Sequence, residues 1–143
     1  MDPSDSAQPS EEPAGSHASP LVLIVDDEAP IAEALALIVE EAGYATLTAF
    51  RGPAGLALAR EHHPALIFTD MMMPQLDGAA LIETLRRDAE TDGHTAPLIV
   101  AMTAGALRYA RKASVDAILP KPFAIDEVEA ILNRLLPLDE QAS

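Results

Sequence analysis

Short apolar runs alternate with helical patterns along most of this chain, and no other feature restricts the possible folds as strongly. The apolar runs, which we expect to be strands, cover residues 21–25, 44–49, 65–69, 98–102 and 116–120. Helical patterns cover residues 30–43, 53–63, 78–89, 107–113 and 125–136. Five strands that alternate with five helices predict an α/β fold, in which a parallel sheet is covered by helices on both faces.

Two of the helical patterns indicate which side of the helix faces the sheet. In residues 30–43, the spacing of the apolar residues places one set on a common face: Ile31, Leu35, Ile38 and Ala42. In residues 125–136, the expected buried face consists of Val128, Ile131, Leu132 and Leu135. These faces are the parts of the two helices that we expect to contact the core.

The composition excludes several kinds of site. The chain has 143 residues, which fits one domain, and it contains no cysteine. Disulfides, thiolate metal sites and a cysteine nucleophile are therefore excluded. The formal net charge is −14, and no basic stripe offsets it, so we expect no direct binding of nucleic acid.

The first 19 residues differ in composition from the rest of the chain. They are rich in Pro, Ser, Ala and Glu and contain almost no large apolar residue, so we predict a disordered tail over 1–19 and a folded domain over 20–143. No apolar run approaches the roughly 20 residues of a membrane span. The N-terminus lacks the pattern of a secretory signal. We therefore expect a cytoplasmic protein that does not insert into membranes.

Polar side chains follow four of the five predicted strands. Asp26 and Asp27 follow the first strand, Asp70 the third, Thr103 the fourth and Lys121 the fifth. In an open parallel sheet, sites form at the carboxyl ends of the strands, so these side chains should meet at one edge. Carboxylates this close together need a cation, and an all-oxygen ligand set favours Mg²⁺.

This set of residues suits phosphoryl transfer. A metal ion and the Lys121 ammonium, which can pair with a phosphate oxygen or with Asp70, would neutralise phosphoryl oxygens, and Thr103 would donate a hydrogen bond. The only plausible nucleophile is a carboxylate, and its product would be an aspartyl phosphate.

Four short motifs at these strand ends occur together in one known family. They are "VDDE", "DMMMPQLDG", "MTA" and "PKPF", in this order along the chain. With this set, residues 20 to 137 resemble the response-regulator receiver domains of two-component signalling. The resemblance implies a flavodoxin-like fold with strand order 2-1-3-4-5.

The resemblance implies a role for each acidic residue. Asp70 would be the phosphoacceptor, taking its phosphoryl group from a histidine kinase or a histidine phosphotransfer protein. Asp27 would bind Mg²⁺ directly, and Asp26 would bind it largely through a water molecule. The backbone carbonyl of Met72 would be a further metal ligand.

The resemblance also implies roles for residues on the last two strands. Thr103 and Lys121 would each contact a phosphoryl oxygen, and Thr103 would move on activation. The bond between Lys121 and Pro122 would be a cis peptide, and Pro74 with Gly78 would form the turn after the phosphorylation site.

The chain departs from the family pattern in two neighbouring places. The segment from Thr103 to Lys121 is shorter than in typical receivers by roughly four residues, about one helical turn, which predicts a shortened fourth helix. Ile118 occupies the switch position, where relatives usually carry a Tyr or Phe that rotates when Thr103 moves. Since Ile is β-branched and stiff, we predict a non-standard signalling surface here.

Two further expectations concern the output and the lifetime of the signal. The sequence ends at Ser143, and we expect a stand-alone receiver that signals by protein–protein contact or onward phosphotransfer to a downstream protein. Met72 and Gly105 occupy positions that tune hydrolysis of the aspartyl phosphate in relatives. Neither side chain orients water strongly, so slow autodephosphorylation is our hypothesis.

Two alternatives remain open beside this interpretation. The first is a receiver-like protein-binding module that is not regulated by phosphorylation, which Ile118 and the short fourth helix favour. The second is an enzyme, a phosphatase of the haloacid-dehalogenase type, which would need a second carboxylate where this chain has Met72. We expect no enzyme activity beyond the protein's own phosphorylation and dephosphorylation.

Other residues are given structural roles or none. Asp77 is predicted to be the N-cap of the helix that follows it. Met71, Met72 and Met73 are interpreted as core and loop packing. The adjacent His62 and His63 do not point together, so no metal site is expected from them, and none of the four histidines is assigned a role.

Overall fold

The fold is described by a computed structural model covering residues 19–73, 75–104 and 115–138. Within these ranges, the strands are β1 (Leu21–Val25), β2 (Ala45–Ala49), β3 (Leu66–Asp70), β4 (Leu98–Thr103) and β5 (Ala117–Pro120). The helices are α1 (Ala29–Glu41), α2 (Gly52–His62), α3 (Gly78–Asp92) and α5 (Ile125–Leu135). The predicted helix over 107–113 lies outside the described residues, as does the predicted tail apart from residue 19.

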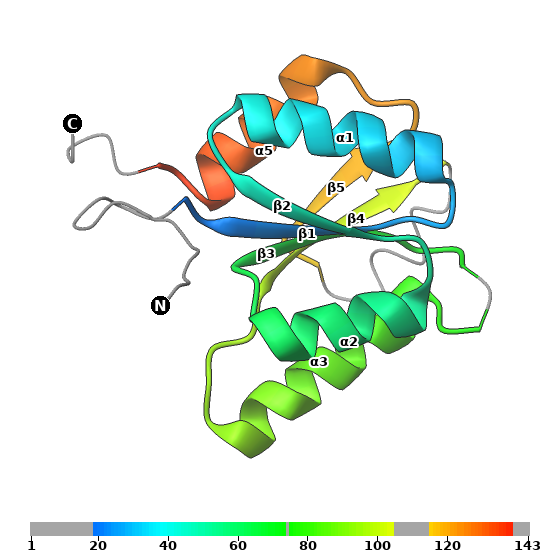
Figure 1. Cartoon of the computed structure of the whole chain (residues 1–143), viewed down its shortest axis with the longest axis vertical. Coiled ribbons are helices and arrows are strands. Elements are labelled where there is room, and N and C mark those ends of the chain that lie inside the picture. The colour runs from blue at the N-terminus through cyan, green and yellow to red at the C-terminus, as the bar shows by residue number, and fades with distance from the viewer. Residues whose placement is uncertain (1–18, 74, 105–114, 139–143) are drawn as a thin grey trace, which may run out of the picture.

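The five strands form one parallel sheet in the order β2-β1-β3-β4-β5, which confirms the predicted order. Residues 22–25 of β1 pair with 66–69 of β3, and β3 pairs on its other side with β4. Figure 1 shows α1 and α5 on one face of the sheet and α2 and α3 on the other. The carboxyl ends of all five strands therefore point to the same edge.

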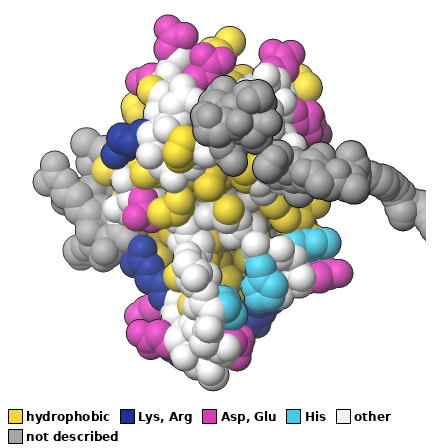
Figure 2. All heavy atoms as spheres, turned by 90° about the vertical axis from the view of Figure 1, so that its left-hand side faces the viewer, with side chains coloured by type: hydrophobic (Ala, Val, Ile, Leu, Met, Phe, Trp, Pro, Cys, Tyr) yellow, Lys and Arg dark blue, Asp and Glu magenta, His cyan; other side chains and the backbone are white. Residues whose placement is uncertain are grey.

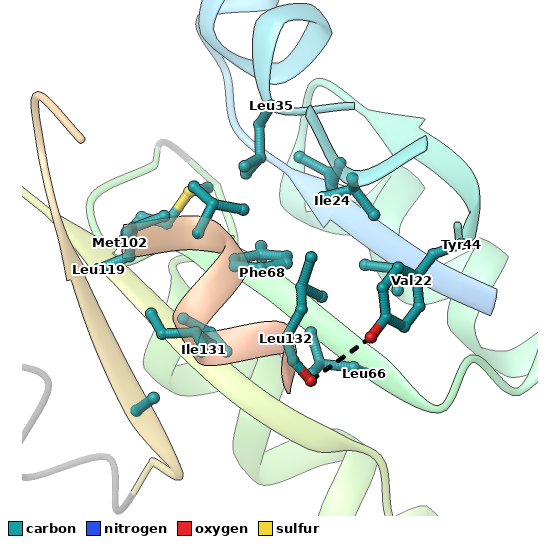
Figure 3. Close-up of a cluster of buried hydrophobic side chains, with 14 of the residues drawn as sticks. Val22, Ile24, Leu35, Tyr44, Leu66, Phe68, Met102, Leu119, Ile131 and Leu132 are labelled. Atoms are coloured by element: carbon teal, nitrogen blue, oxygen red, sulfur yellow. Dashed lines mark hydrogen bonds between the residues drawn. The ribbon is translucent and has the colours of Figure 1, made fainter. Parts of the chain in front are cut away.

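The core between the sheet and helices α1 and α5 is formed by large apolar side chains. Phe68 and Leu66 of the central strand β3 lie beside Ile24 of β1 and Leu132 of α5 (Figure 3). At the end of this layer, the Tyr44 hydroxyl donates hydrogen bonds to the backbone carbonyls of Leu136 at 2.6 Å and Leu132 at 3.5 Å. This side chain therefore ties the start of β2 to the C-terminal end of α5.

The opposite core layer, under α2 and α3, contains smaller side chains. Ala49, Ala59 and Ala101 are buried there together with Met71 and Met73, which confirms the packing role predicted for these two methionines, whereas Met72 is 56% exposed. Gly55 lets α2 approach the sheet, because a Cβ atom at this position would lie 2.7 Å from Val25. The small residues bring α2 and α3 close to the strands that carry the polar residues.

The buried face predicted for α1 is confirmed for Leu35, Ile38 and Ala42 but not for Ile31, and that of α5 is confirmed. The fully buried residues of α1 are Ala32, Leu35 and Val39, and Ile38 lies only partly buried at the margin. The apolar stripe of a helix that faces a core is wider than one row of residues, so Ala32 and Val39, which the prediction left out, are buried beside Leu35. In α5, the predicted residues all belong to the core: Val128, Ile131, Leu132 and, partly buried, Leu135.

No helix in the described ranges has both the length and the apolar character needed to cross a membrane.

Candidate functional site

Three carboxylates meet at the carboxyl edge of the sheet, as the sequence predicts. Asp26 and Asp27 directly follow β1, and Asp70 is the last residue of β3. One oxygen from each carboxylate lies within 4.8 Å of the other two. Asp26 is fully buried and Asp70 is 7% exposed, whereas Asp27 is exposed. The strand ends thus gather three negative charges at the border between core and solvent.

The Lys121 ammonium reaches into this cluster from the end of β5. Its Nζ lies 2.8 Å from Oδ2 of Asp26 and 3.6 Å from Oδ2 of Asp70. Its position is held by the backbone, since the Lys121 N–H donates to the Thr103 carbonyl at 2.9 Å. The sequence predicts a pairing of Lys121 with Asp70 or a phosphate oxygen, but the nearest carboxylate in the structure is that of Asp26.

Backbone N–H groups orient two of the carboxylates. The Glu28 N–H donates to Oδ1 of Asp26 at 2.9 Å, and the Met72 N–H donates to Oδ1 of Asp70 at 3.3 Å. The Glu28 side chain also belongs to the site, because its Oε1 lies 3.7 Å from Nζ of Lys121. Glu28 was not among the predicted site residues, although its place directly after the two aspartates was a usable signal.

Burial and charge change the acidity of two groups in this cluster. Burial, reinforced by the charges of Asp26 and Asp27, raises the pKa of Asp70 to about 6, although Lys121 and the Met72 N–H oppose the shift. For Lys121, burial favours the neutral amine, but the contact with Asp26 and the charges of Asp70 and Glu28 prevail and raise the pKa above its usual value. Lys121 therefore stays charged, and Asp70 is a carboxylate at neutral pH.

The remaining predicted residues lie around the cluster. Thr103 is buried at the end of β4, one residue beyond Met102, the β4 residue that pairs with Asp70. The bond between Lys121 and Pro122 is cis, as predicted. Ile118 is partly buried and packs against the core layer under α2 and α3.

The start of α3 lies against the end of β3. Asp77 caps this helix as predicted, since its Oδ1 accepts a hydrogen bond from the Ala80 N–H at 2.9 Å. Gly78 packs against the strand end, where a Cβ atom would lie 2.7 Å from the Asp70 carbonyl oxygen. Pro74, the other predicted turn residue, lies outside the described residues, as does Gly105.

The donor set of this cluster fits Mg²⁺. All side-chain donors are oxygen atoms, which this hard cation prefers. Oδ2 of Asp26 is buried and receives no well-directed hydrogen bond from the described residues, although the Lys121 ammonium lies 2.8 Å away. Such an oxygen is suited to a cation or to water bound by a cation, and Asp27 is exposed toward the solvent from which the ion would enter.

The chain matches the family model described as the response regulator receiver domain over residues 22–133. It is 33% identical over 120 residues to the DNA-binding dual master transcriptional regulator RpaA of Synechocystis, covering 82% of this chain and 49% of the relative. It is 41% identical over 107 residues to a response regulator receiver protein of Anaeromyxobacter, covering 74% of this chain and 44% of that protein. The chain spans about half the length of these curated relatives.

Solved structures show the same fold. The receiver domain of the Francisella response regulator 1452 is 32% identical, with a TM-score of 0.69 and coverage of 81% of this chain and 95% of that chain. The Vibrio cholerae chemotaxis protein CheY4 is 25% identical, with a TM-score of 0.74 and coverage of 83% of this chain and 100% of that chain. The family model, the relatives and the fold agree, and the chain belongs to the response-regulator receiver domain family.

Proposed function

We propose that this receiver domain accepts a phosphoryl group on Asp70 from a histidine kinase or a histidine phosphotransfer protein. The observation that carries the proposal is the convergence of three carboxylates within 4.8 Å on one buried ammonium. A group of like charges this compact is costly to fold, so it is best explained by chemistry that needs it.

In the proposed reaction, a carboxylate oxygen of Asp70 attacks phosphorus. The bond from this oxygen to phosphorus forms as the bond from phosphorus to the donor imidazole nitrogen breaks, and the imidazole takes up a proton as it leaves. Because the pKa of Asp70 is about 6, its carboxyl group is mostly ionised at neutral pH and can act as the nucleophile. The Lys121 ammonium, now 3.6 Å from Oδ2 of Asp70, would then contact a phosphoryl oxygen.

Asp26, Asp27 and Asp70, with the backbone carbonyl of Met72, would hold Mg²⁺ in this proposal. When bound, the ion supplies positive charge that offsets the carboxylates and the transferring phosphoryl oxygens. The buried Asp26 accepts from the Glu28 N–H, so its orientation is set before any ligand enters.

The surface beside Asp27 offers room and apolar contacts for a phosphodonor protein. A cavity of about 450 Å³ opens there, lined by Asp27, Phe50, Arg51 and Gln75. Phe50 is 41% exposed, and the Met72 side chain next to Asp70 is also exposed. Large apolar side chains that remain exposed around a polar site are suited to a protein partner.

Phosphorylation with a small donor tests the proposal directly. The protein is incubated with Mg²⁺ and acetyl phosphate, and its intact mass is measured beside that of the Asp70→Asn variant. We expect one added phosphoryl group in the wild type and none in the variant. An unmodified wild type would contradict the proposal, and rapid release of phosphate that persists in the Asp70→Asn variant would indicate a phosphatase that does not use Asp70.

One observation favours a second function, a protein-binding module whose contacts do not respond to phosphate. Ile118 is packed into the core layer under α2 and α3, and it has no ring or hydroxyl to move when Thr103 is engaged. If Asp70 is phosphorylated but partner binding is equal for the phosphorylated and unphosphorylated protein, this second function is supported. A difference in affinity supports signalling through protein contact.

A further inference from the structure

A second group of polar and titratable side chains, two of them histidines, lies at the opposite edge of the sheet. Helices α2 and α3 both end there, each just before the next strand begins. A cavity of about 310 Å³ lies between their ends, and its polar lining includes Arg60, His63, Asp88, Asp92, His94 and Thr95. Figure 2 shows histidine side chains gathered on this face among acidic and basic ones.

The two imidazoles in this cavity come from different loops and contact each other. The ring centres of His63 and His94 lie 4.8 Å apart, with 70° between the ring planes. His63 ends α2 in the left-handed conformation, with φ of 47° and its N–H donating to the Ala59 carbonyl at 2.9 Å. The His94 N–H donates to the Ala89 carbonyl at 3.1 Å. The helix ends thus hold both histidines in place.

The ring of His94 contacts a backbone carbonyl group. Its Nδ1 lies 3.2 Å from the Thr95 carbonyl oxygen, and in the tautomer that donates to this oxygen Nε2 is the acceptor. Metal-binding histidines commonly donate their other ring N–H to a backbone carbonyl in this way. Nε2 lies 3.8 Å from Oδ2 of Asp92, so a carboxylate stands beside the nitrogen that would bind a metal.

We propose that His63 and His94, completed by Asp92, form a site for a divalent transition-metal cation of the Zn²⁺ class. Two imidazoles that bind one Zn²⁺ at about 2.0–2.1 Å place their ring centres about 5 Å apart, close to the spacing observed. Before an ion binds, the ligand atoms of the three residues do not all lie within 4.8 Å of one another, so the Asp92 side chain, which is 61% exposed, would rotate toward the ion. Imidazole nitrogen beside one carboxylate selects this class of cation over Mg²⁺.

The charges around the cavity favour a cation. Asp88 forms an ion pair with Arg60, whose Nε and Nη2 donate hydrogen bonds to the two Asp88 carboxylate oxygens at 2.7 and 3.2 Å. Of the two carboxylates that line the cavity, Asp92 is therefore the one not paired with Arg60. The formal net charge of the chain, −14, also favours the binding of a cation. A bound cation would join the C-terminal ends of α2 and α3, and binding to the folded state alone would raise the stability of the domain.

Calorimetric titration with ZnCl₂ tests this site, with Mg²⁺ kept in large excess to occupy the acidic cluster. We expect one equivalent of Zn²⁺ to bind with micromolar affinity. His94→Ala and His63→Asn should each weaken binding by about tenfold or more, because each loses a ligand. Asn tolerates the left-handed backbone at 63, so this variant keeps the helix end while removing the imidazole.

The matched control is His62→Ala, which removes a neighbouring histidine. His62 is exposed and does not line the cavity, and its Nε2 lies 3.7 Å from Oε1 of Glu61. This variant should bind Zn²⁺ as the wild type does and show the same rise in Tm on addition of the metal. Circular dichroism confirms that each variant is folded. Full binding by both His63→Asn and His94→Ala would overturn the proposal. Loss of Zn²⁺ binding in Asp27→Asn would overturn it as well, because the ion would then occupy the acidic cluster.

Discussion

The two edges of the sheet carry the same kinds of charged side chain in opposite surroundings. At the carboxyl edge, the Lys121 side chain is 10% exposed and lies 2.8 Å from the fully buried Asp26. At the amino edge, the Arg60 side chain is 53% exposed and pairs with Asp88 at 2.7 Å. The two ion pairs are equally short, so burial rather than distance separates them.

This difference indicates what each pair does. Buried charges lose their hydration, and they are tolerated only when each is matched by a partner. Exposed pairs keep most of their hydration and contribute little to stability. The carboxyl edge is therefore a costly arrangement that its chemistry explains, whereas the amino edge can lose a charge without consequence for the fold. Substitutions at both edges test this distinction.

The largest effect is expected from Lys121→Met, which keeps the length of the side chain but removes its charge. Asp26 would then be a buried carboxylate without a cation, a change that typically costs about 3–5 kcal/mol. Urea unfolding in a chelating buffer measures the loss in free energy of unfolding. The double variant Asp26→Asn with Lys121→Met should recover a large part of it. Equal stability of the wild type and the single variant would refute the role assigned to the buried pair.

Asp70→Asn should raise the free energy of unfolding, whereas Lys121→Met should lower it, and the change should be smaller. The pKa of Asp70 rises from 3.8 to about 6 on folding, so the folded protein binds this proton more tightly than the unfolded chain does. Its contribution to stability is present below pH 3.8 and is lost as the pH rises through about 6. Without metal at pH 7.5, Asn should stabilise the fold by about 1–3 kcal/mol.

The pH dependence supplies the control for this variant. Urea unfolding of the wild type and Asp70→Asn is compared at pH 7.5 and pH 4, both in a chelating buffer. The advantage of the variant should shrink toward pH 4, because the Asp70 carboxyl group is then protonated in the folded wild type. An advantage that does not change with pH would show that burial of the charge is not its cause.

Asp27→Asn separates metal binding from folding at the same edge. Asp27 is exposed, so in a chelating buffer its loss should change the free energy of unfolding by less than about 0.5 kcal/mol. Calorimetric titration with MgCl₂ should nevertheless show affinity reduced by about tenfold or more, because a proposed direct ligand is lost. Unchanged Mg²⁺ affinity would remove Asp27 from the proposed site.

The sequence predicted the sheet and its acidic edge because both depend on strong local patterns. Buried runs such as 65–69 can be recognised from their apolar residues, and four of the five predicted strands are followed by a polar residue that the fold brings to the common edge. The distances in the cluster could not be predicted. That Lys121 lies nearer to Asp26 than to Asp70 depends on how β5 is placed against β4, which no local pattern encodes.

The histidines and helix α1 also show that local sequence patterns do not predict contacts between distant segments. The sequence places His62 beside His63, but the imidazole that contacts His63 belongs to His94, in a loop that only the packing of α2 against α3 brings near. In α1, apolar spacing identified Leu35, Ile38 and Ala42, but it missed the buried Ala32 and Val39. Contacts between distant segments depend on side-chain volume as well as on periodicity.

Arg60→Met makes the same kind of change at the amino edge as Lys121→Met makes at the carboxyl edge, and it should have the smallest effect. Its partner Asp88 stays in contact with water when the pair is broken, so no buried charge is left unmatched. The Tm of the Arg60→Met variant should remain close to that of the wild type. Any difference in Tm should disappear in 1 M NaCl, where the screening length is about 3 Å. A loss of stability as large as that of Lys121→Met would mean that burial does not distinguish the two edges. A small, salt-sensitive loss would mean that the same charge is dispensable where water reaches it and required where water does not.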